Sequence, residues 1–537
     1  MGCITICRIS MGSIFSNKHR LGQAVWRIVL FVALSNMGYA KPLSDAEIAL
    51  VAENAMSQFD VPGMAIGILK GGEVVHLKGY GIRELGNEAL VDSKTMFKVA
   101  SNTKAFTTAA LAILVDEGKI SWQTKVVDVI PEFRLSDSWV TSNLNVLDLL
   151  THRSGMNQGA GDLMLWPEPN NFTRADIIYG LRYFELVKQF RAEYAYDNLL
   201  YIVAGELIPR LTNMQWREFV DARIMQPLNL HNCFAGAMSP AAKMNLAAPH
   251  GLVNGKLAVI ERSRINDAVS NMAAAGAIKC SAEDMTVWMK TLLRRGEMAG
   301  SARLYSEEQA TQMWTSHIPR GVGSFEREWG NTHFSGYGLG WRTSDVYGYK
   351  QVSHTGSLAG FRSFMTLVPE LELGVVVLTN GSSSMARKAV MYNLIRSYMT
   401  DEDVDWTGEL VKSQKAYESS SSPEPELEFK PLDKKTVDEV VGSYEDPWFG
   451  EIELFRRGGK LLLRSIMSPI LVGELKYLGD SEFVVQWFDR TLEADAFVRF
   501  YKNASGIISG AKMEAVSPET DFSFDFHDLS FKPVKER

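Results

Sequence analysis

The chain is organised around the stretch Phe97-Lys98-Val99-Ala100-Ser101-Asn102-Thr103-Lys104 and the apolar run that follows it. Positions 105–115 are apolar almost all round, which predicts a helix buried inside a domain, and Gly118 predicts its end. On such a helix Ser101 and Lys104 lie on one face, about one turn apart. Burial lowers the pKa of a lysine, so its neutral amine can take a serine proton. The pattern therefore predicts a serine nucleophile.

The spacing S-x-x-K is weak evidence by itself, because the chain contains it twice. The second copy, Ser509-Gly510-Ala511-Lys512, lies in a glycine-broken, strand-like region with no buried helix behind it. The setting of Ser101 therefore carries the prediction.

Length and composition indicate a soluble globular protein of two domains. The chain has 537 residues, of which 46% are hydrophobic and 22% charged. Its net charge is −7, and positions 1–40 hold four basic and no acidic residues, so the remainder carries −11. An acidic protein without a basic stripe argues against nucleic acid as a partner.

The N-terminus has the pattern of an export signal. Basic residues up to Arg27 precede the apolar run 28–34, and Gly38 and Ala40 occupy the −3 and −1 positions of a cleavage site after Ala40. The run is short for a membrane span, so we expect a periplasmic or secreted protein with no stable span after signal removal. The alternative is an uncleaved anchor.

Two cysteines, Cys233 and Cys280, remain after removal of 1–40. They could form one disulfide in an oxidising compartment, but we expect two buried free thiols. The chain has no C-x-x-C or H-x-x-x-H pattern, so we expect no metal site and no cofactor.

The order of patterns along 41–402 predicts an α+β domain. A capping box at Ser44–Glu47 opens a helix over 44–59, and strands are expected at 64–69, 73–77, 351–356, 361–368 and 374–379. Segment 337–341 is expected to start a strand, and a helix at 385–399 closes the domain. The glycine- and proline-bearing segment 157–172 is expected to be a loop that forms a wall of the substrate cleft. His152, before it, is interpreted as a structural hydrogen-bonding residue.

The composition changes after residue 402. Residues 403–432 are polar, charged and proline-bearing, and we expect a linker there. Residues 433–537 contain short strand patterns, typical of a small all-β, barrel-like domain whose aromatic residues form its core.

Three motifs stand in order along the first domain: Ser101-x-x-Lys104, Tyr196-Asp197-Asn198 and His354-Thr355-Gly356. This ordered set resembles the serine β-lactamase and penicillin-binding-protein-like hydrolases, in particular the class C β-lactamase and D,D-carboxypeptidase-like branch. The resemblance covers about residues 43–400. It implies an antiparallel sheet flanked by helices plus an all-helical subdomain, and the C-terminal domain resembles the lipocalin-like domains of some members.

The resemblance also implies roles for these residues. Ser101 would form an acyl-enzyme with an amide or ester, and Lys104 and Tyr196 would share the proton transfer, either of them as base. The oxyanion would be bound by the backbone N–H groups of Ser101 and Ser357. The implied substrate-binding residues are Asn198, His354, Thr355, Gly356 and Ser357.

His354 departs from the lysine that many β-lactamases carry at this position. A histidine is mostly neutral at pH 7, so carboxylate recognition is expected to be weaker or pH-dependent. We therefore predict a peptidase, acting on D-residue-containing or cell-wall peptides, or an esterase, with a small-molecule or peptide substrate. The alternatives are a class C-like β-lactamase and a non-catalytic binding protein that retains the fold.

Overall fold

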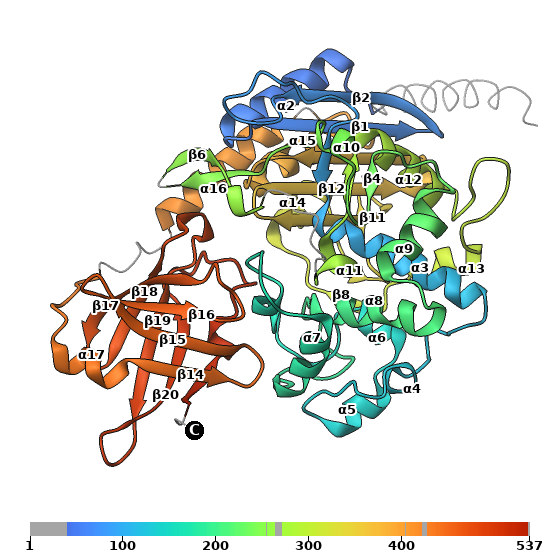
Figure 1. Ribbon diagram of the computed structural model, residues 1–537. Coiled ribbons are helices and arrows are strands. Elements are labelled where there is room, and N and C mark those ends of the chain that lie inside the picture. Colours follow the sequence, from blue (N-terminus) through green and yellow to red (C-terminus); the bar gives the residue numbers. More distant parts are fainter. Residues whose placement is uncertain (1–39, 254, 264–270, 403, 421–426, 535–537) are drawn as a thin grey trace, which may run out of the picture.

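The computed structural model describes residues 40–253, 255–263, 271–402, 404–420 and 427–534. The predicted export signal lies outside these residues apart from Ala40. The first domain is built on an eight-stranded antiparallel sheet (Figure 1). In spatial order its strands are β2 (Glu73–Gly81), β1 (Gly63–Lys70), β13 (Leu373–Thr379), β12 (Phe361–Val368), β11 (Tyr349–Leu358), β10 (Arg342–Val346), β9 (Ser335–Tyr337) and β8 (Ile318–Arg320).

Alternating apolar residues let the central strands bury both of their faces. On β1, Ile66 and Ile68 belong to the core formed with α2 (Asp45–Gln58) and α15 (Ser384–Ser397). Ala65 and Leu69 belong to the larger core on the opposite face, which includes α12 (Ala282–Leu293) and α3 (Thr103–Asp116). Successive strand residues point to opposite faces, so one strand serves both layers.

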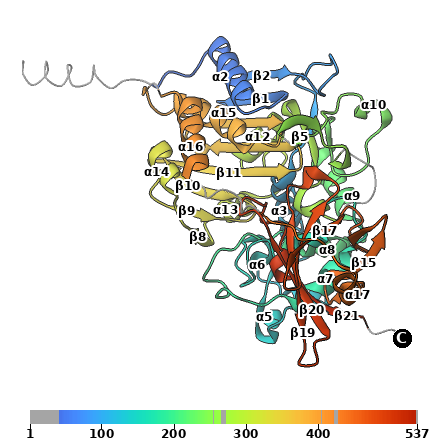
Figure 2. The ribbon, with the colours of Figure 1, turned by 90° about the vertical axis from the view of Figure 1, so that its left-hand side faces the viewer.

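The remaining helices of the first domain lie mostly in a helical region beyond the sheet, but α14 (Ser324–Gly330) packs against the core that contains α2 and α15. Figures 1 and 2 place the β1–β2 edge at one end of the molecule and α4–α6 at the other, with the barrel beside α7. These helices are α4 (Val126–Val129), α5 (Ser138–Asn143), α6 (Val146–Leu150), α7 (Arg174–Gly180), α8 (Leu199–Thr212), α9 (Trp216–Val220), α10 (Pro240–Lys243), α11 (Ala273–Gly276), α13 (Glu307–Met313) and α14 (Ser324–Gly330).

Most of the predicted elements are confirmed. The capping box of α2 forms as expected, with Glu47 N–H donating to Ser44 Oγ and Ser44 N–H donating to the Glu47 carboxylate. The expectation that a strand starts at 337–341 is wrong, since β9 ends at Tyr337 and β10 begins at Arg342. Gly340 has φ +80°, and a Cβ there would lie 3.1 Å from the Lys104 carbonyl oxygen. This connection therefore turns against the backbone of α3.

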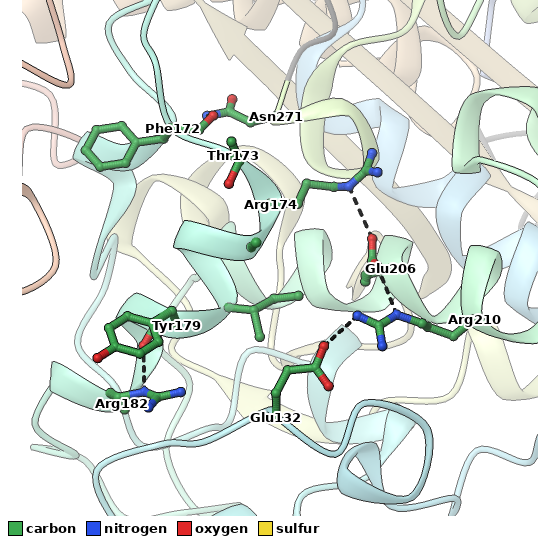
Figure 3. Close-up of a pocket in the computed structure, with 11 residues that line it drawn as sticks. Glu132, Phe172, Thr173, Arg174, Tyr179, Arg182, Glu206, Arg210 and Asn271 are labelled. Carbon is green, nitrogen blue, oxygen red and sulfur yellow. Dashed lines mark hydrogen bonds and ion pairs between the residues drawn. The ribbon is translucent and has the colours of Figure 1, made fainter.

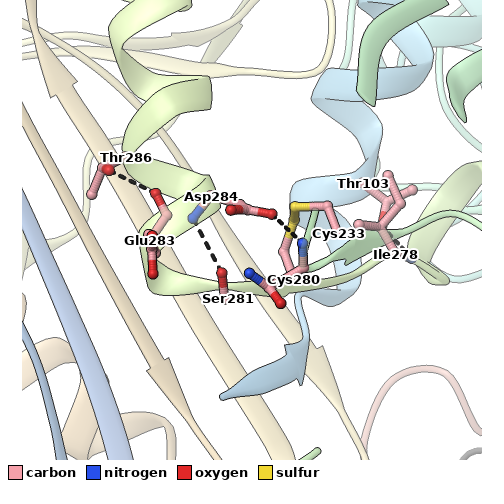
Figure 4. The surroundings of a disulfide bond; sticks show 9 residues. Thr103, Cys233, Ile278, Cys280, Ser281, Glu283, Asp284 and Thr286 are labelled. Atoms are coloured by element: carbon pink, nitrogen blue, oxygen red, sulfur yellow. Dashed lines mark hydrogen bonds between the residues drawn. A yellow bond between two sulfur atoms is a disulfide. The ribbon is translucent and has the colours of Figure 1, made fainter. Parts of the chain in front are cut away.

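The expectation of two free thiols is also wrong. Cys233 of β4 (Cys233–Phe234) and Cys280 of β7 (Lys279–Ser281) stand opposite each other in antiparallel strands, with Cα atoms 4.1 Å apart, and form a disulfide (Figure 4). β7 also pairs with β3 (Met96–Lys98), the strand that leads to Ser101. The two cysteines are far apart in sequence, and only this three-stranded sheet brings them together.

The segment expected to be a linker begins with a helix. α16 (Trp406–Ser420) buries Trp406 and Leu410 in the core that contains α2 and α15. The serine- and proline-rich residues 421–426 of that segment lie outside the described residues. Two further strands, β5 (His250–Val253) and β6 (Lys256–Val259), form a separate hairpin.

The C-terminal domain is a closed eight-stranded barrel preceded by α17 (Lys434–Val440). As predicted, its aromatic residues form its core: the Phe500 ring lies 5.5 Å from that of Tyr444 and 5.6 Å from that of Phe483. In the part of the chain that the structure describes, every helix is too short or too polar to span a bilayer. The barrel strands are β14 (Gly442–Asp446), β15 (Gly450–Arg457), β16 (Lys460–Ser465), β17 (Val472–Gly479), β18 (Glu482–Trp487), β19 (Ala496–Lys502), β20 (Ile508–Ala515) and β21 (Ser530–Pro533).

Candidate active site

Ser101 lies in a short 3-10 turn, η1 (Ala100–Asn102), between β3 and α3. Ala100 has φ +50°, a conformation that costs free energy for a residue with a side chain and persists only where its surroundings enforce it. Here the surroundings are hydrogen bonds: Val99 N–H donates to the Ile278 carbonyl at 2.9 Å, and Ser363 Oγ donates to the Val99 carbonyl at 2.6 Å. The backbone at Ser101 is therefore fixed from two sides.

Lys104 is fully buried one turn into α3. Its Nζ lies 3.1 Å from Ser101 Oγ, 2.7 Å from Asn198 Oδ1 and 3.1 Å from the Ala275 carbonyl oxygen. Burial lowers the pKa of Lys104 to about 7, against the opposing effect of the nearby Asp162 and Asp197 carboxyls. A substantial fraction of this amine is therefore neutral near pH 7.

Tyr196 approaches Ser101 from the loop before α8, and its hydroxyl donates to Ser101 Oγ at 2.9 Å. Burial raises the pKa of Tyr196 far above its ordinary value, so the phenol stays protonated. His152 supports this loop: its Nδ1 accepts the Asp197 N–H at 3.0 Å, and its ring lies 4.3 Å from that of Tyr196. The structural interpretation of His152 is confirmed.

Strand β11 lies directly against the Ser101 turn. A Cβ on Gly356 would stand 2.2 Å from the Val99 carbonyl oxygen, so only glycine permits this approach. Thr355 and Ser357, on either side, both line the cleft above Ser101.

His354 is placed differently from its neighbours on β11. It is buried and does not line the cleft: Nδ1 donates to the Thr355 carbonyl at 2.7 Å, and Nε2 accepts from the Tyr337 hydroxyl at 2.9 Å. Burial, assisted by Arg342, lowers the pKa of His354 well below its usual range. The structure thus brings together all the predicted site residues except the His354 ring.

The cleft above Ser101 has a volume of about 370 Å³ and is lined by several arginines. Arg320 and Arg342 are two of them, and neither forms an ion pair with a carboxylate of the described residues. The Nε atom of each is buried without a hydrogen-bond partner. Two neighbouring cations without a paired carboxylate in the described part of the chain make this part of the cleft suited to an anionic group.

A larger cavity, of about 550 Å³, lies between α7 and α8 (Figure 3). Both of its carboxylates are already paired within the cavity: Glu206 pairs with Arg174 at 3.2 Å and with Arg210 at 3.1 Å, and Arg210 also pairs with Glu132 at 2.5 Å. None of the lining residues is a serine or cysteine nucleophile. We therefore place the chemistry in the smaller cleft.

Several site residues were missed from the sequence. Two of them could have been found from their positions in the sequence. Arg342 directly follows segment 337–341, and Asp162 lies within the loop that was predicted to form a wall of the cleft. Phe522 and Asp525 had no such positional signal, because nothing in the barrel sequence indicates that the segment before β21 reaches this cleft. Their contacts are described below.

Comparison with protein families gives two matches. The model described as Beta-lactamase matches residues 48–399, and a domain of unknown function, DUF3471, matches residues 428–533. Among curated proteins, the chain is similar to an unguisins hydrolase (ungD') of Aspergillus campestris. The two are 29% identical over 380 residues, which is 67% of each chain.

Solved structures show the same fold at low identity. The octameric penicillin-binding protein homologue from Pyrococcus abyssi aligns with a TM-score of 0.55 at 21% identity, covering 91% of this chain and 100% of that one. A class C beta lactamase from Rhodobacter sphaeroides aligns with a TM-score of 0.52 at 19% identity, over 65% of this chain and 98% of that one. The fold class predicted from the sequence is confirmed.

Proposed function

Because the chain belongs to the beta-lactamase family, whose model matches most of its length, we propose that it is a serine hydrolase with Ser101 as nucleophile. The observation that carries the proposal is the contact between Ser101 Oγ and the buried Lys104 amine at 3.1 Å. Ser101 Oγ attacks an amide or ester carbonyl, the bond to the leaving group breaks, and water then hydrolyses the acyl-enzyme.

Lys104 is the base in this proposal. A neutral amine has two hydrogens and one lone pair, and Asn198 Oδ1 and the Ala275 carbonyl can accept both hydrogens. The lone pair is then left for the Ser101 proton. Tyr196 has a raised pKa and is unsuited to act as a base, so its hydroxyl donates to Ser101 Oγ and passes a proton to the leaving group, with Lys104 replenishing it.

The developing oxyanion is assigned to the backbone N–H groups of Ser101 and Ser357. Support comes from Gly356, whose lack of a side chain lets β11 lie against the turn that carries Ser101. Arg387 reinforces this strand, since it donates to the Gly356 carbonyl and, at 3.2 Å, to Ser357 Oγ.

The substrate in this proposal is a peptide or ester with an anionic group. Arg320 and Arg342 supply the permanent positive charge that a neutral His354 does not. This weakens the argument from His354 against a β-lactamase, because a β-lactam also carries a carboxylate. A class C-like β-lactamase therefore remains the second candidate, and a non-catalytic binding protein is the third.

Export to the periplasm or the exterior is also part of the proposal. The Cys233–Cys280 disulfide supports it, because disulfides persist in oxidising compartments. If the signal is cleaved after Ala40, N-terminal sequencing of the exported protein will begin at Lys41.

Intact-protein mass spectrometry after incubation with a fluorophosphonate, and separately with a penicillin, tests the proposal. We expect one fluorophosphonate adduct on the wild type and on Ser509→Ala, and none on Ser101→Ala. A lasting penicillin adduct would favour a peptidase, and rapid penicillin turnover would favour a β-lactamase. No adduct with either reagent would favour the binding protein.

A further inference from the structure

The barrel takes part in the walls of the Ser101 cleft. The segment between β20 and β21 reaches across to the first domain, and Asp521, Phe522, Ser523 and Phe524 line the cleft. The Phe522 ring meets the Tyr196 ring edge-on, with centroids 6.2 Å apart. The barrel loop at 491–493 lines the same cleft. The family match that covers the barrel describes a domain of unknown function, and this contact indicates a role for it at the cleft.

Asp525 makes the most specific of these inter-domain contacts. It is fully buried, and its two carboxyl oxygens accept backbone hydrogen bonds from Gly161 at 2.7 Å and from Leu163 at 3.0 Å. These N–H groups belong to the start of a short 3-10 turn, η2 (Asp162–Met164), which has no side-chain cap from its own segment. A residue of the barrel therefore fixes the backbone on both sides of Asp162.

Asp162 continues the connection toward the nucleophile. Its Oδ2 accepts the Asn198 side-chain N–H at 2.9 Å. Because that nitrogen faces Asp162, the Asn198 oxygen faces Lys104 Nζ, at 2.7 Å. Hydrogen bonds thus connect the barrel to the base without a gap. They run from Asp525 to the backbone around Asp162, and from the Asp162 carboxyl through Asn198 to Lys104.

We propose that Asp525 is a positioning residue, through which the barrel holds the Asp162–Asn198 pair and thereby orients the Lys104 amine toward Ser101. The inference rests on the proposed function and adds that the active site is incomplete without the barrel. It follows that the C-terminal domain is a working part of the hydrolase.

The electrostatic surroundings supply a readout that a purely structural role would not change. Burial raises the pKa of Asp162 well above its usual range, and the adjacent Asp525 raises it further. An ionised Asp162 in turn raises the pKa of Lys104, as Asp197 does, whereas Arg342 lowers it. The Tyr196 and Tyr201 rings also face Nζ, with centroids 4.9 Å and 5.0 Å away.

The test measures the rate of fluorophosphonate labelling of Ser101 against pH, together with thermal unfolding, in the full-length protein. For Asp525→Asn we expect labelling at pH 7 to fall at least about tenfold per folded molecule, because one backbone N–H then faces an amide NH₂. We also expect the acidic limb of its pH–rate profile to move to higher pH. Asp162 ionises more readily without Asp525, and an ionised Asp162 raises the pKa of Lys104. Asp480→Asn, in the exposed β17–β18 turn, is the matched control and should behave as wild type.

Asp162→Asn tests the same connection without changing the barrel, in case Asp525→Asn does not fold. It removes the carboxyl group that, when ionised, raises the pKa of Lys104, so the acidic limb of the pH–rate profile should move to lower pH. The inference would be overturned if either folded variant labelled at the wild-type rate with the wild-type pH dependence. It would also be overturned if the labelling rate fell only in proportion to the unfolded fraction of the protein. Failure of the proposed function is distinct, because the wild type itself would then remain unlabelled.

Discussion

The two S-x-x-K copies in this chain have the same spacing and very different surroundings. Lys104 is fully buried and Ser101 lies against strand β11, whereas Ser509 and Lys512 are both exposed on barrel strand β20. The Ser509 hydroxyl donates to the Tyr501 carbonyl at 3.3 Å, beside a register shift in the ladder between β19 and β20. Burial and the partners that direct the lysine amine, and not the spacing, distinguish the first copy from the second.

The largest effect should separate the two serines. Ser101→Ala removes the nucleophile, and we expect kcat/KM to fall by at least about 10³-fold. Ser509→Ala should leave it unchanged, because Ser509 contacts neither the cleft nor Lys104. Steady-state hydrolysis of a chromogenic ester or peptide measures both. Equal losses in the two variants would remove the basis of the comparison.

The two lysines should differ almost as strongly. Lys104→Met keeps the approximate volume and removes the base, so we expect kcat to fall by about 10²–10⁴-fold with a smaller change in KM. Lys512→Met serves as the control and should retain wild-type kinetics. An active Lys104→Met enzyme would show that another group takes the Ser101 proton.

Gly356→Ala tests the close approach of strand β11 to the turn that carries Ser101. The new Cβ would collide with the Val99 carbonyl and push β11 away from Ser101. Displacing an oxyanion donor costs about 10²-fold in kcat, which is the loss we expect. Circular dichroism and thermal unfolding would show whether the variant is folded, and an unaffected kcat would exclude Ser357 as an oxyanion donor.

The pH profile tests the burial of Lys104. Its pKa is lowered to about 7, so the amine loses its proton as pH rises through 7. We therefore expect kcat/KM to rise through this range and to fall roughly tenfold per unit below about pH 6. The Lys512→Met variant should show the same fall in kcat/KM at low pH. A rate that stays constant from pH 5 to 8 would contradict Lys104 as the base.

The smallest effect should come from Phe522, a barrel residue that lines the cleft. Phe522→Ala removes a ring from the cleft wall without touching Ser101, so we expect a change of a few-fold in KM and little change in kcat. Measuring KM for a series of substrates of increasing size tests this, and we expect KM to fall most for the substrates with the widest acyl groups. An identical ranking in wild type and variant would argue against a role for Phe522 in selectivity.

Periodicity and local motifs predicted much of the fold. The helix over 44–59, the five sheet strands and the buried helix after Ser101 follow from apolar spacing and capping residues. The disulfide and the turn at 337–341 did not, because each depends on an approach between distant segments. α16 was missed because its sequence is largely polar, and its contact with the core rests on a few apolar side chains, chiefly Trp406 and Leu410.

In the candidate active site, too, local motifs predicted some features, whereas others depend on contacts between distant segments. Ser101, Lys104, Tyr196 and Asn198 converge as their order in the chain predicted. The position of His354 could not be read from its motif, because it depends on the contact with Tyr337 and on burial beneath the cleft. The contribution of Asp525 depends on how two domains pack, for which the sequence holds no periodic signal.

The Cys233–Cys280 bridge has a consequence for when the protein becomes competent. Strand β7 is tied by it to β4, and the residues just before β7 supply the Ile278 carbonyl to Val99 and the Ala275 carbonyl to Lys104. Newly made chains held among cytosolic thiols would have to keep this segment in place by hydrogen bonds alone. If the protein is exported as proposed, formation of the disulfide after export would complete the support of the turn that carries Ser101, and this turn would be less firmly held before export.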